Sequence, residues 1–320
     1  MKNTFRILFS VLTVASLTLF VTGCKDKGTI PTITTVNVSD IYLASAVGGG
    51  TITDDGGNAI TERGVCWSTS ENPTINDYIA VNHTDGDNFE ADITSLQWAT
   101  TYYVRAYATN SEGTAYGESV SFTTSTPYAL VYIDADENDD KVEEALAAQR
   151  CNVTTVSSSS AFATGLASGN YNLAVLFTQG SPTTSYSGYI TKDLISTYIN
   201  GGGLMIYATF SASDNEYAAL LNAGFSGNYN LTAVTITDPL MIAKAGLSSL
   251  TLSNPGYGTF STGLTALTGG SVLANFANGD AAIVLGNEGH TIMLGYLSDT
   301  PTTKIQEIFE SVLIKLNASI

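Results

Sequence analysis

The chain has 320 residues, of which 44% are hydrophobic and 13% are charged, and its formal net charge is −17. This composition supports buried cores and excludes a disordered tail, and the length favours two domains. The acidic balance argues against nucleic acid and against electrostatic binding to an anionic lipid surface, because both need clustered Lys and Arg.

The first residues have the features of a bacterial lipoprotein signal peptide. Lys2 and Arg6 precede an almost wholly apolar run, 7–21, and Val21-Thr22-Gly23-Cys24 ends it with small residues before the thiol. The run is shorter than the roughly 20 residues that span a bilayer. It resembles the lipobox of bacterial lipoproteins, in which cleavage before the cysteine is coupled to acylation. A transmembrane helix and an ordinary secretory signal are the alternatives.

The resemblance implies a location. Residues 1–23 would be removed, Cys24 would carry the lipid, and 24–28 would form a short lipidated linker. Two or more acyl chains hold a protein on a membrane almost permanently. Lys25 is not the aspartate that is associated with inner-membrane retention, so we expect the bacterial outer membrane. Whether the protein faces the cell surface or the periplasm stays open.

Residues 29–126 are predicted to form an all-β domain. Short β-branched and aromatic segments are interrupted by turns such as Gly48-Gly49-Gly50 and Asp54-Asp55-Gly56-Gly57, at the spacing of a β-sandwich. The strand predicted at 100–109 alternates two sets of side chains. The set expected to point inward is Tyr102, Val104, Ala106 and Ala108.

The approach to this strand carries a family resemblance. The run 96–102 reads Leu-Gln-Trp-Ala-Thr-Thr-Tyr, and Asn110 and Gly113 follow the strand. This resembles the Leu-x-Pro-x-Thr-x-Tyr entry and the Asn-x-x-Gly exit of fibronectin type III domains, with Trp98 in place of the proline. The resemblance implies that Tyr102 is a corner tyrosine whose hydroxyl ties the edge of a strand. It also implies a spacer or binding scaffold, since a fold alone does not give a function.

The other face of the same strand carries Tyr103, Arg105 and Tyr107. If exposed, they would form an aromatic and cationic stripe able to stack on a sugar or a partner chain. Ordinary cross-strand packing is the alternative that we favour. The stripe remains a candidate binding surface for adhesion.

Residues 127–320 are predicted to form an α/β domain. Continuous apolar runs, which are typical of strands covered on both faces, lie at 129–133, 173–177 and 204–208. Amphipathic helical patterns lie at 142–146, 190–199 and 305–316. Because strand and helix alternate, we expect a parallel, three-layer, flavodoxin-like sheet. A late β-rich section is expected at 272–276, 281–285 and 291–296.

Two strand entries in this domain, Tyr171-Asn172-Leu173 and Asn200-Gly201-Gly202-Gly203, resemble those of the class I glutamine amidotransferase-like fold, including its trehalose-utilisation relatives. In the amidotransferases the following strand runs into a Gly-x-Cys-x-Gly elbow, whose glycines make room for a strained turn. Here 207–212 reads Tyr-Ala-Thr-Phe-Ser-Ala, without that cysteine or those glycines. The late His-x-Glu pair is also replaced, by Gly-Tyr-Leu-Ser-Asp at 295–299. The resemblance implies the fold without the amidotransferase chemistry.

A small ligand of this domain would be expected in the crevice at the carboxyl ends of the central strands. The candidate residues there are Asp134, Asp136, Gln179, Thr209 and Ser211. They offer polar groups without an activated nucleophile, which indicates binding more than catalysis.

The acidic run after the first strand is a weak metal candidate. An EF-hand loop needs Gly at its sixth position and Glu at its twelfth, and Asp139 and Ala145 stand there. We favour the beginning of a helix, whose dipole attracts acidic side chains, and keep calcium as a minor alternative. No other cofactor is predicted. The oxygen donors of the weak site would be Asp134, Asp136, Asn138 and Asp140.

Ser211, His290 and Asp299 could be combined into a triad, but such residues occur by chance in most chains of this size. The sequence therefore favours a non-enzymatic, lipid-anchored envelope protein with a binding, adhesion or assembly role toward a glycan or another envelope protein. The alternative is a degenerate hydrolase or carbohydrate-processing accessory that uses Ser211 or a metal at Asp134 and Asp136.

Cys66 and Cys151 are the two cysteines that remain if Cys24 is lipidated. They fall in different predicted domains, each inside an apolar, strand-like run. A disulfide between them is possible in an oxidising compartment, but it needs Cα atoms within about 7 Å, and we favour two buried thiols.

Overall fold

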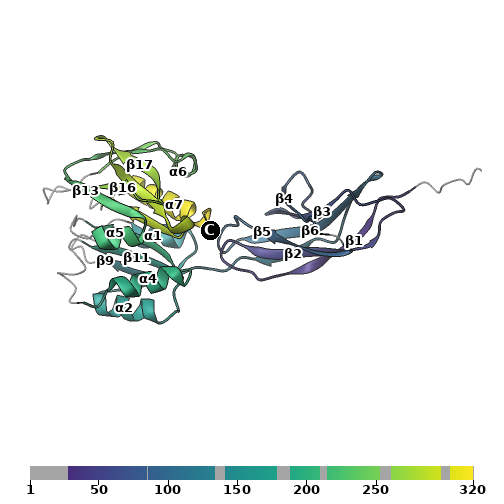
Figure 1. Cartoon of the computed structure of the whole chain (residues 1–320), viewed down its shortest axis with the longest axis horizontal. Helices are drawn as coiled ribbons and strands as arrows, with labels where there is room; N and C mark the ends of the chain where they lie inside the picture. Colours follow the sequence, from purple (N-terminus) through teal and green to yellow (C-terminus); the bar gives the residue numbers. More distant parts are fainter. Residues whose placement is uncertain are drawn as a thin grey trace, which may run out of the picture.

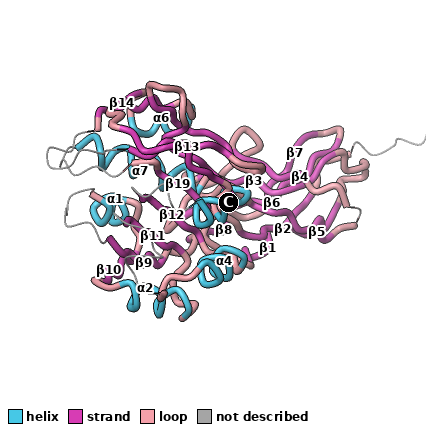
Figure 2. The backbone as a smooth tube through the Cα atoms, turned by 60° about the vertical axis from the view of Figure 1, so that its left-hand side comes forward, coloured by secondary structure: helices cyan, strands magenta, loops and turns pink. Residues whose placement is uncertain are grey.

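The chain forms a β-sandwich followed by an α/β domain, which lie at opposite ends of an elongated molecule (Figure 1). The computed structural model describes residues 28–84, 86–133, 141–178, 188–209, 215–252, 261–296 and 303–319. All helices of these residues belong to the second domain (Figure 2). The predicted signal peptide and Cys24 lie outside the described residues.

Two antiparallel sheets form the sandwich. One has the order β1-β2-β5, and the other has the order β4-β3-β6-β7 with β8 also paired to β6. The strands of the first are β1 (Thr32–Ser39), β2 (Ala46–Asp54) and β5 (Asn88–Ile93). Those of the second are β3 (Glu62–Ser68), β4 (Tyr78–Val81), β6 (Thr101–Asn110), β7 (Gly113–Tyr116) and β8 (Val120–Thr123).

The alternation of β6 is confirmed on its inner face. Tyr102, Val104, Ala106 and Ala108 are at most 5% exposed and pack in the sandwich core. The corner role expected of Tyr102 is also confirmed, because its hydroxyl accepts a 3.0 Å hydrogen bond from the backbone N–H of Gln97. The facing sheet comes close here, since a Cβ atom at Gly50 would lie 2.5 Å from that of Ala106. Glycine at this position is therefore required by packing.

Five parallel strands form the centre of the α/β domain in the order β10-β9-β11-β12-β19. In chain order this is 2-1-3-4-5, the flavodoxin-like arrangement of a doubly wound sheet. The strands are β9 (Tyr128–Ile133), β10 (Asn152–Val156), β11 (Leu173–Thr178), β12 (Leu204–Thr209) and β19 (Thr291–Leu294). The predicted continuous apolar runs are β9, β11 and β12, whose side chains are almost all buried.

Helices cover both faces of this sheet, which confirms the predicted three layers. One face packs against α1 (Val142–Ala148), α6 (Pro239–Ala245) and α7 (Thr303–Asn317). The other packs against α2 (Ser159–Ala167), α4 (Lys192–Asn200) and α5 (Asn215–Leu220). Side chains alternate along each strand, so every strand contributes to both cores.

The late β-rich section extends the same sheet with antiparallel strands. β18 (Ala281–Gly286) pairs with β19, and β17 (Ser271–Phe276) and β14 (Ala233–Ile236) continue the order to β15 (Ser249–Thr251). β16 (Ser261–Ala266) pairs with β18 and with β13 (Ala223–Tyr229). The 3-10 turn η1 (Asn287–Gly289) connects β18 to β19.

An ion pair joins α6 to α7. Lys315 Nζ lies 2.9 Å from Asp238 Oδ2, and the two side chains are 21% and 11% exposed. Asp238 Oδ1 also accepts a 3.0 Å hydrogen bond from the backbone N–H of Met241, so Asp238 caps the amino end of α6. The Asp238 carboxylate thus caps α6 and also forms an ion pair with α7.

Trp98 connects the two domains. The residue belongs to the sandwich sequence, yet it is only 5% exposed and lies in the core cluster formed by α1, α6, α7 and the sheet. On either side of it, Asn317 Nδ2 donates to Leu96 O at 2.9 Å and Arg150 Nη1 donates to Ala99 O at 2.7 Å. A buried aromatic ring between two such hydrogen bonds fixes the orientation of the domains.

The described chain begins at the other end of the sandwich. Thr29 donates its backbone N–H to Gly56 O at 2.9 Å, and its carbonyl accepts from Asn110 Nδ2 at 2.7 Å. Asn110 is the last residue of β6, whereas β6 starts beside the joint. Ten residues of strand place these two ends about 30 Å apart.

Candidate functional site

The predicted crevice lies at the carboxyl ends of β9, β11 and β12, which end at Ile133, Thr178 and Thr209. Of the five candidate residues, Thr209 is the one that the structure describes. The others, and the weak metal donors, lie outside the described residues: Asp134, Asp136, Asn138, Asp140, Gln179 and Ser211. Within the described ranges no three His, Cys, Asp or Glu side chains gather as a metal site.

Two threonines stand side by side at this edge. Thr178 and Thr209 are paired across β11 and β12, and both are fully buried. The Thr178 hydroxyl has no hydrogen-bond partner, which is unusual for a buried polar group. The Thr209 carbonyl accepts from Thr262 Oγ1 at 3.4 Å. Hydroxyls of this kind can donate and accept hydrogen bonds, but they are not nucleophiles without a base.

His290 lies at the opposite edge of the sheet. Its carbonyl accepts a 3.0 Å hydrogen bond from the backbone N–H of Met205, near the start of β12, and its Nδ1 lies 3.0 Å from Asn287 O. Thr209 ends the same strand about 13 Å further on. Ser211 and Asp299 lie outside the described residues, so the suggested triad stays a hypothesis.

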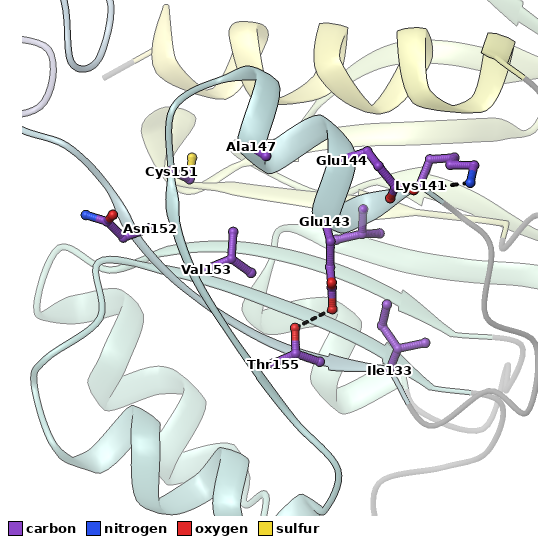
Figure 3. A pocket seen from close by; sticks show the side chains of 10 residues that line it. Ile133, Lys141, Glu143, Glu144, Ala147, Cys151, Asn152, Val153 and Thr155 are labelled. Carbon is purple, nitrogen blue, oxygen red and sulfur yellow. Dashed lines mark hydrogen bonds and ion pairs between the residues drawn. The ribbon is translucent and has the colours of Figure 1, made fainter.

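A groove of about 770 Å³ opens between α1 and the edge strand β10 (Figure 3). Its charged side chains contact neighbours within the groove. Glu143 Oε1 accepts from Thr155 Oγ1 at 2.5 Å, and Lys141 Nζ lies 3.2 Å from Glu144 Oε1. The floor, formed by residues such as Val153 and Ala147, is aliphatic. Neither the paired charges nor the aliphatic floor indicates a particular class of ligand.

The expected binding stripe on β6 is not an exposed row. Tyr107 is fully buried, and its hydroxyl donates to Glu62 Oε1 at 2.8 Å. Arg105 is half-buried, its Nε donates to Gly117 O at 2.8 Å, and its guanidinium lies 4.8 Å from the centre of the Tyr116 ring. Tyr103 is half-buried. The candidate exposed stripe is thus wrong at Tyr107, and Arg105 makes its contacts within the domain, in line with the favoured alternative of packing on the sheet face.

The segment between β3 and β4 explains this correction. Pro73 is buried, and its carbonyl accepts from Cys66 Sγ at 3.4 Å on the outer face of the sheet. Ile75 donates its backbone N–H to the Tyr116 hydroxyl at 3.3 Å. The segment therefore folds over the face that carries Cys66 and Tyr107. Strand alternation could not reveal this cover, because a connection outside the strand supplies it.

Both described cysteines are free, as expected. Cys66 is buried, and burial raises the pKa of its thiol to about 11 although the nearby Arg105 charge opposes the shift. Cys151 is half-buried, and burial raises the pKa of its thiol to about 12. The expectation of two buried thiols is thus met fully at Cys66 and in part at Cys151.

These thiols should be unreactive in the folded protein. Because the thiolate is the nucleophile, at pH 8 only about one thousandth of Cys66 would be in the reactive form. We expect neither thiol to react with Ellman's reagent within minutes in the native chain that starts at Lys25, and both to react in guanidinium chloride. One equivalent of thiol that reacts with Ellman's reagent within minutes in the native protein would contradict this prediction.

No family model matches the chain, and no curated protein matches it. A protein assigned as a GMP synthase subunit from Thermoplasma acidophilum matches at 13% identity and a TM-score of 0.43, over 60% of this chain and 95% of that one. The sensor domain of the anti-sigma factor RsgI4 from Pseudobacteroides cellulosolvens matches at 21% identity and a TM-score of 0.24, over 30% and 94%. A human fibronectin type III domain matches at 23% identity and a TM-score of 0.25, over 34% and 88%. These weak likenesses fit a multidomain, β-rich protein and carry no argument about function.

Proposed function

We propose that the chain is a non-enzymatic, lipid-anchored binding protein of the bacterial outer membrane. The sandwich acts as a fibronectin type III-like spacer, and the amidotransferase-like domain, of the trehalose-utilisation type, carries the binding role. The partner is a glycan or another envelope protein. The observation that carries the proposal is the arrangement of the molecule along its long axis. The described chain starts at one end of the sandwich, and the α/β domain is attached to the other end.

This arrangement suits a protein that is held on a membrane at its amino end. A lipid on Cys24 would stand four residues before Gly28, the first described residue. The sandwich would then separate the membrane from the α/β domain by about the 30 Å length of its longest strand. Burial of Trp98 in the core of the second domain favours a stiff connection between the domains. A flexible connection would let the α/β domain fold back toward the membrane.

The absence of a catalytic motif from the sequence supports binding over hydrolysis. The strand that would lead into the amidotransferase elbow ends at Thr209, followed by Phe210 and Ser211 instead of a glycine-flanked cysteine. His290 lies at the other edge of the sheet from the end of that strand. Among the described residues, no helix is long and apolar enough to span a bilayer.

Replacing Cys24 with serine tests the anchor. In a Gram-negative host grown with radiolabelled palmitate, we expect the wild-type chain to incorporate label and to enter the detergent phase of a Triton X-114 partition. Cys24→Ser should incorporate no label, because the acylated sulfur is gone. Cys66→Ser and Cys151→Ser are matched controls that should keep the label. Labelled Cys24→Ser protein would overturn the proposal.

A further inference from the structure

A groove of about 610 Å³ lies between α2 and α4, at the amino ends of β11 and β12. We call it the α2–α4 groove. One wall is formed by the end of α2 and by the residues that precede β11. The other wall is formed by α4 and by the glycines that follow it. The lining residues that matter here are Tyr171, Asn172, Asp193, Thr197, Tyr198 and Gly202.

Two tyrosine rings line this groove. Tyr198 is held in place because its hydroxyl donates to Leu204 O at 3.2 Å and its ring lies on the backbone of Gly203. A Cβ atom at Gly203 would come within 2.5 Å of that ring, so only glycine leaves room for it. Tyr171 is half-buried on the β11 side. Both rings pack in part against the core beneath α2 and α4, and the parts that remain exposed line the groove with fixed, amphipathic aromatic surface.

Polar groups surround the rings. Asp193 and Thr197 line the groove and are exposed, so a ligand can reach their side-chain oxygens, although the Asp193 charge also acts on Lys192. Gly169 and Gly202 have open space on the side where a Cβ atom would stand. A ligand can thus reach both the rings and the oxygens.

Three other grooves in the described residues lack this combination. The groove beside β10 is aliphatic with paired charges, and a groove of about 450 Å³ around His290 has no aromatic ring besides the imidazole. A groove of about 650 Å³ outside β1, β2 and β5 has Phe89 as its one aromatic residue, which is 5% exposed. A smaller groove of about 160 Å³ at the joint is lined by Trp98, but that ring is only 5% exposed. Of these five grooves, the α2–α4 groove is the one that combines partly exposed aromatic rings with exposed side-chain oxygens.

We propose that the α2–α4 groove binds a neutral oligosaccharide. A sugar ring has an apolar C–H face that packs on tyrosine and hydroxyls that donate to a carboxylate or a threonine oxygen. The net charge of −17 repels polyanionic glycans, which leaves neutral ones. The proposal rests on the binding role proposed above, and it names the ligand class and the site.

Isothermal titration of the chain from residue 24, made soluble by Cys24→Ser, tests this with maltohexaose and cellohexaose as probes and a hyaluronan hexasaccharide as the anionic control. We expect at least one neutral probe to bind and the anionic one not to bind. Tyr171→Ala should weaken binding about tenfold, the loss expected for one aromatic contact. Ala167→Trp, which fills the groove from its exposed rim, should abolish it.

Tyr78→Ala is the matched control, because Tyr78 is 69% exposed on the sandwich and far from the groove. It should leave binding unchanged, and circular dichroism should show that every variant is folded. Failure of both neutral probes to bind, or binding that Tyr171→Ala and Ala167→Trp leave intact, would overturn the proposal. The palmitate experiment measures lipidation at Cys24 and does not depend on glycan binding. The two proposals can therefore fail independently.

Discussion

Replacing Trp98 with alanine is expected to lower the free energy of unfolding of the α/β domain by about 3–5 kcal/mol, the range for deleting a large buried aromatic side chain. The ring is 5% exposed and completes a core that otherwise belongs to the second domain. The variant should also loosen the joint, because the hydrogen bonds that Asn317 and Arg150 make to the sandwich would lose the packing between them.

Two signals report the domains separately in urea. The chain has two tryptophans, so in Trp98→Ala the fluorescence of Trp67 reports the sandwich alone, while ellipticity at 222 nm reports the helices of the second domain. We expect the helical transition to move to lower urea and the radius of gyration from X-ray scattering to increase. Trp98→Phe should cost less, because most of the buried ring area is kept. An unchanged helical transition in Trp98→Ala would contradict the role of this residue.

Asp238→Ala is expected to cost about 2–3 kcal/mol, because it removes the cap of α6 and leaves Lys315 partly buried without its partner. Asp238→Asn should cost less, since an amide oxygen can still cap the helix. Chemical denaturation at pH 7 measures both. A cost below about 0.5 kcal/mol for Asp238→Ala would show that the pair contributes little.

The contribution of Asp238 should depend on pH. Burial alone would raise the pKa of its carboxyl, but the hydrogen bond from Lys315, the Met241 N–H and the Lys315 charge together hold that pKa below its usual value. Stability from this group is therefore present above the unfolded pKa of about 3.9 and is lost as pH falls through the lower folded value. The stability difference between wild type and Asp238→Asn should shrink in that acidic range. A difference that stays constant down to pH 2 would contradict the linkage.

Much of the fold could be predicted from local patterns. The continuous apolar runs became β9, β11 and β12, the late amphipathic pattern became α7, and Tyr102 makes the expected corner hydrogen bond. These features depend on side-chain periodicity and on burial of both faces of a sheet, which the sequence records directly. The pairing of β13 with β16 was not predicted, because pairing between strands distant in sequence leaves no local pattern.

The candidate sites were less predictable. Alternation along β6 placed Tyr107 on the outer face, but Pro73 and its neighbours cover that face. The α2–α4 groove was missed because its residues come from parts of the chain that are distant in sequence: the connection around Tyr171, helix α4 at Asp193, and the turn at Gly202. The one signal that could have pointed to it is the glycine run 201–203, which begins three residues after Tyr198.

The sequence by itself determined that a β-rich domain precedes an α/β domain and determined the order of their main elements, because these features depend on neighbours along the chain. The lipobox at Cys24 is a prediction from the same kind of local pattern. Tertiary structure decided what Trp98 does. From the sequence it is a substitution for proline in a fibronectin type III-like pattern, whereas in the fold it is a core residue of the following domain. Only the folded chain brings residues 96–100 against the ends of α1 and α7, and the burial that results is a property of that contact.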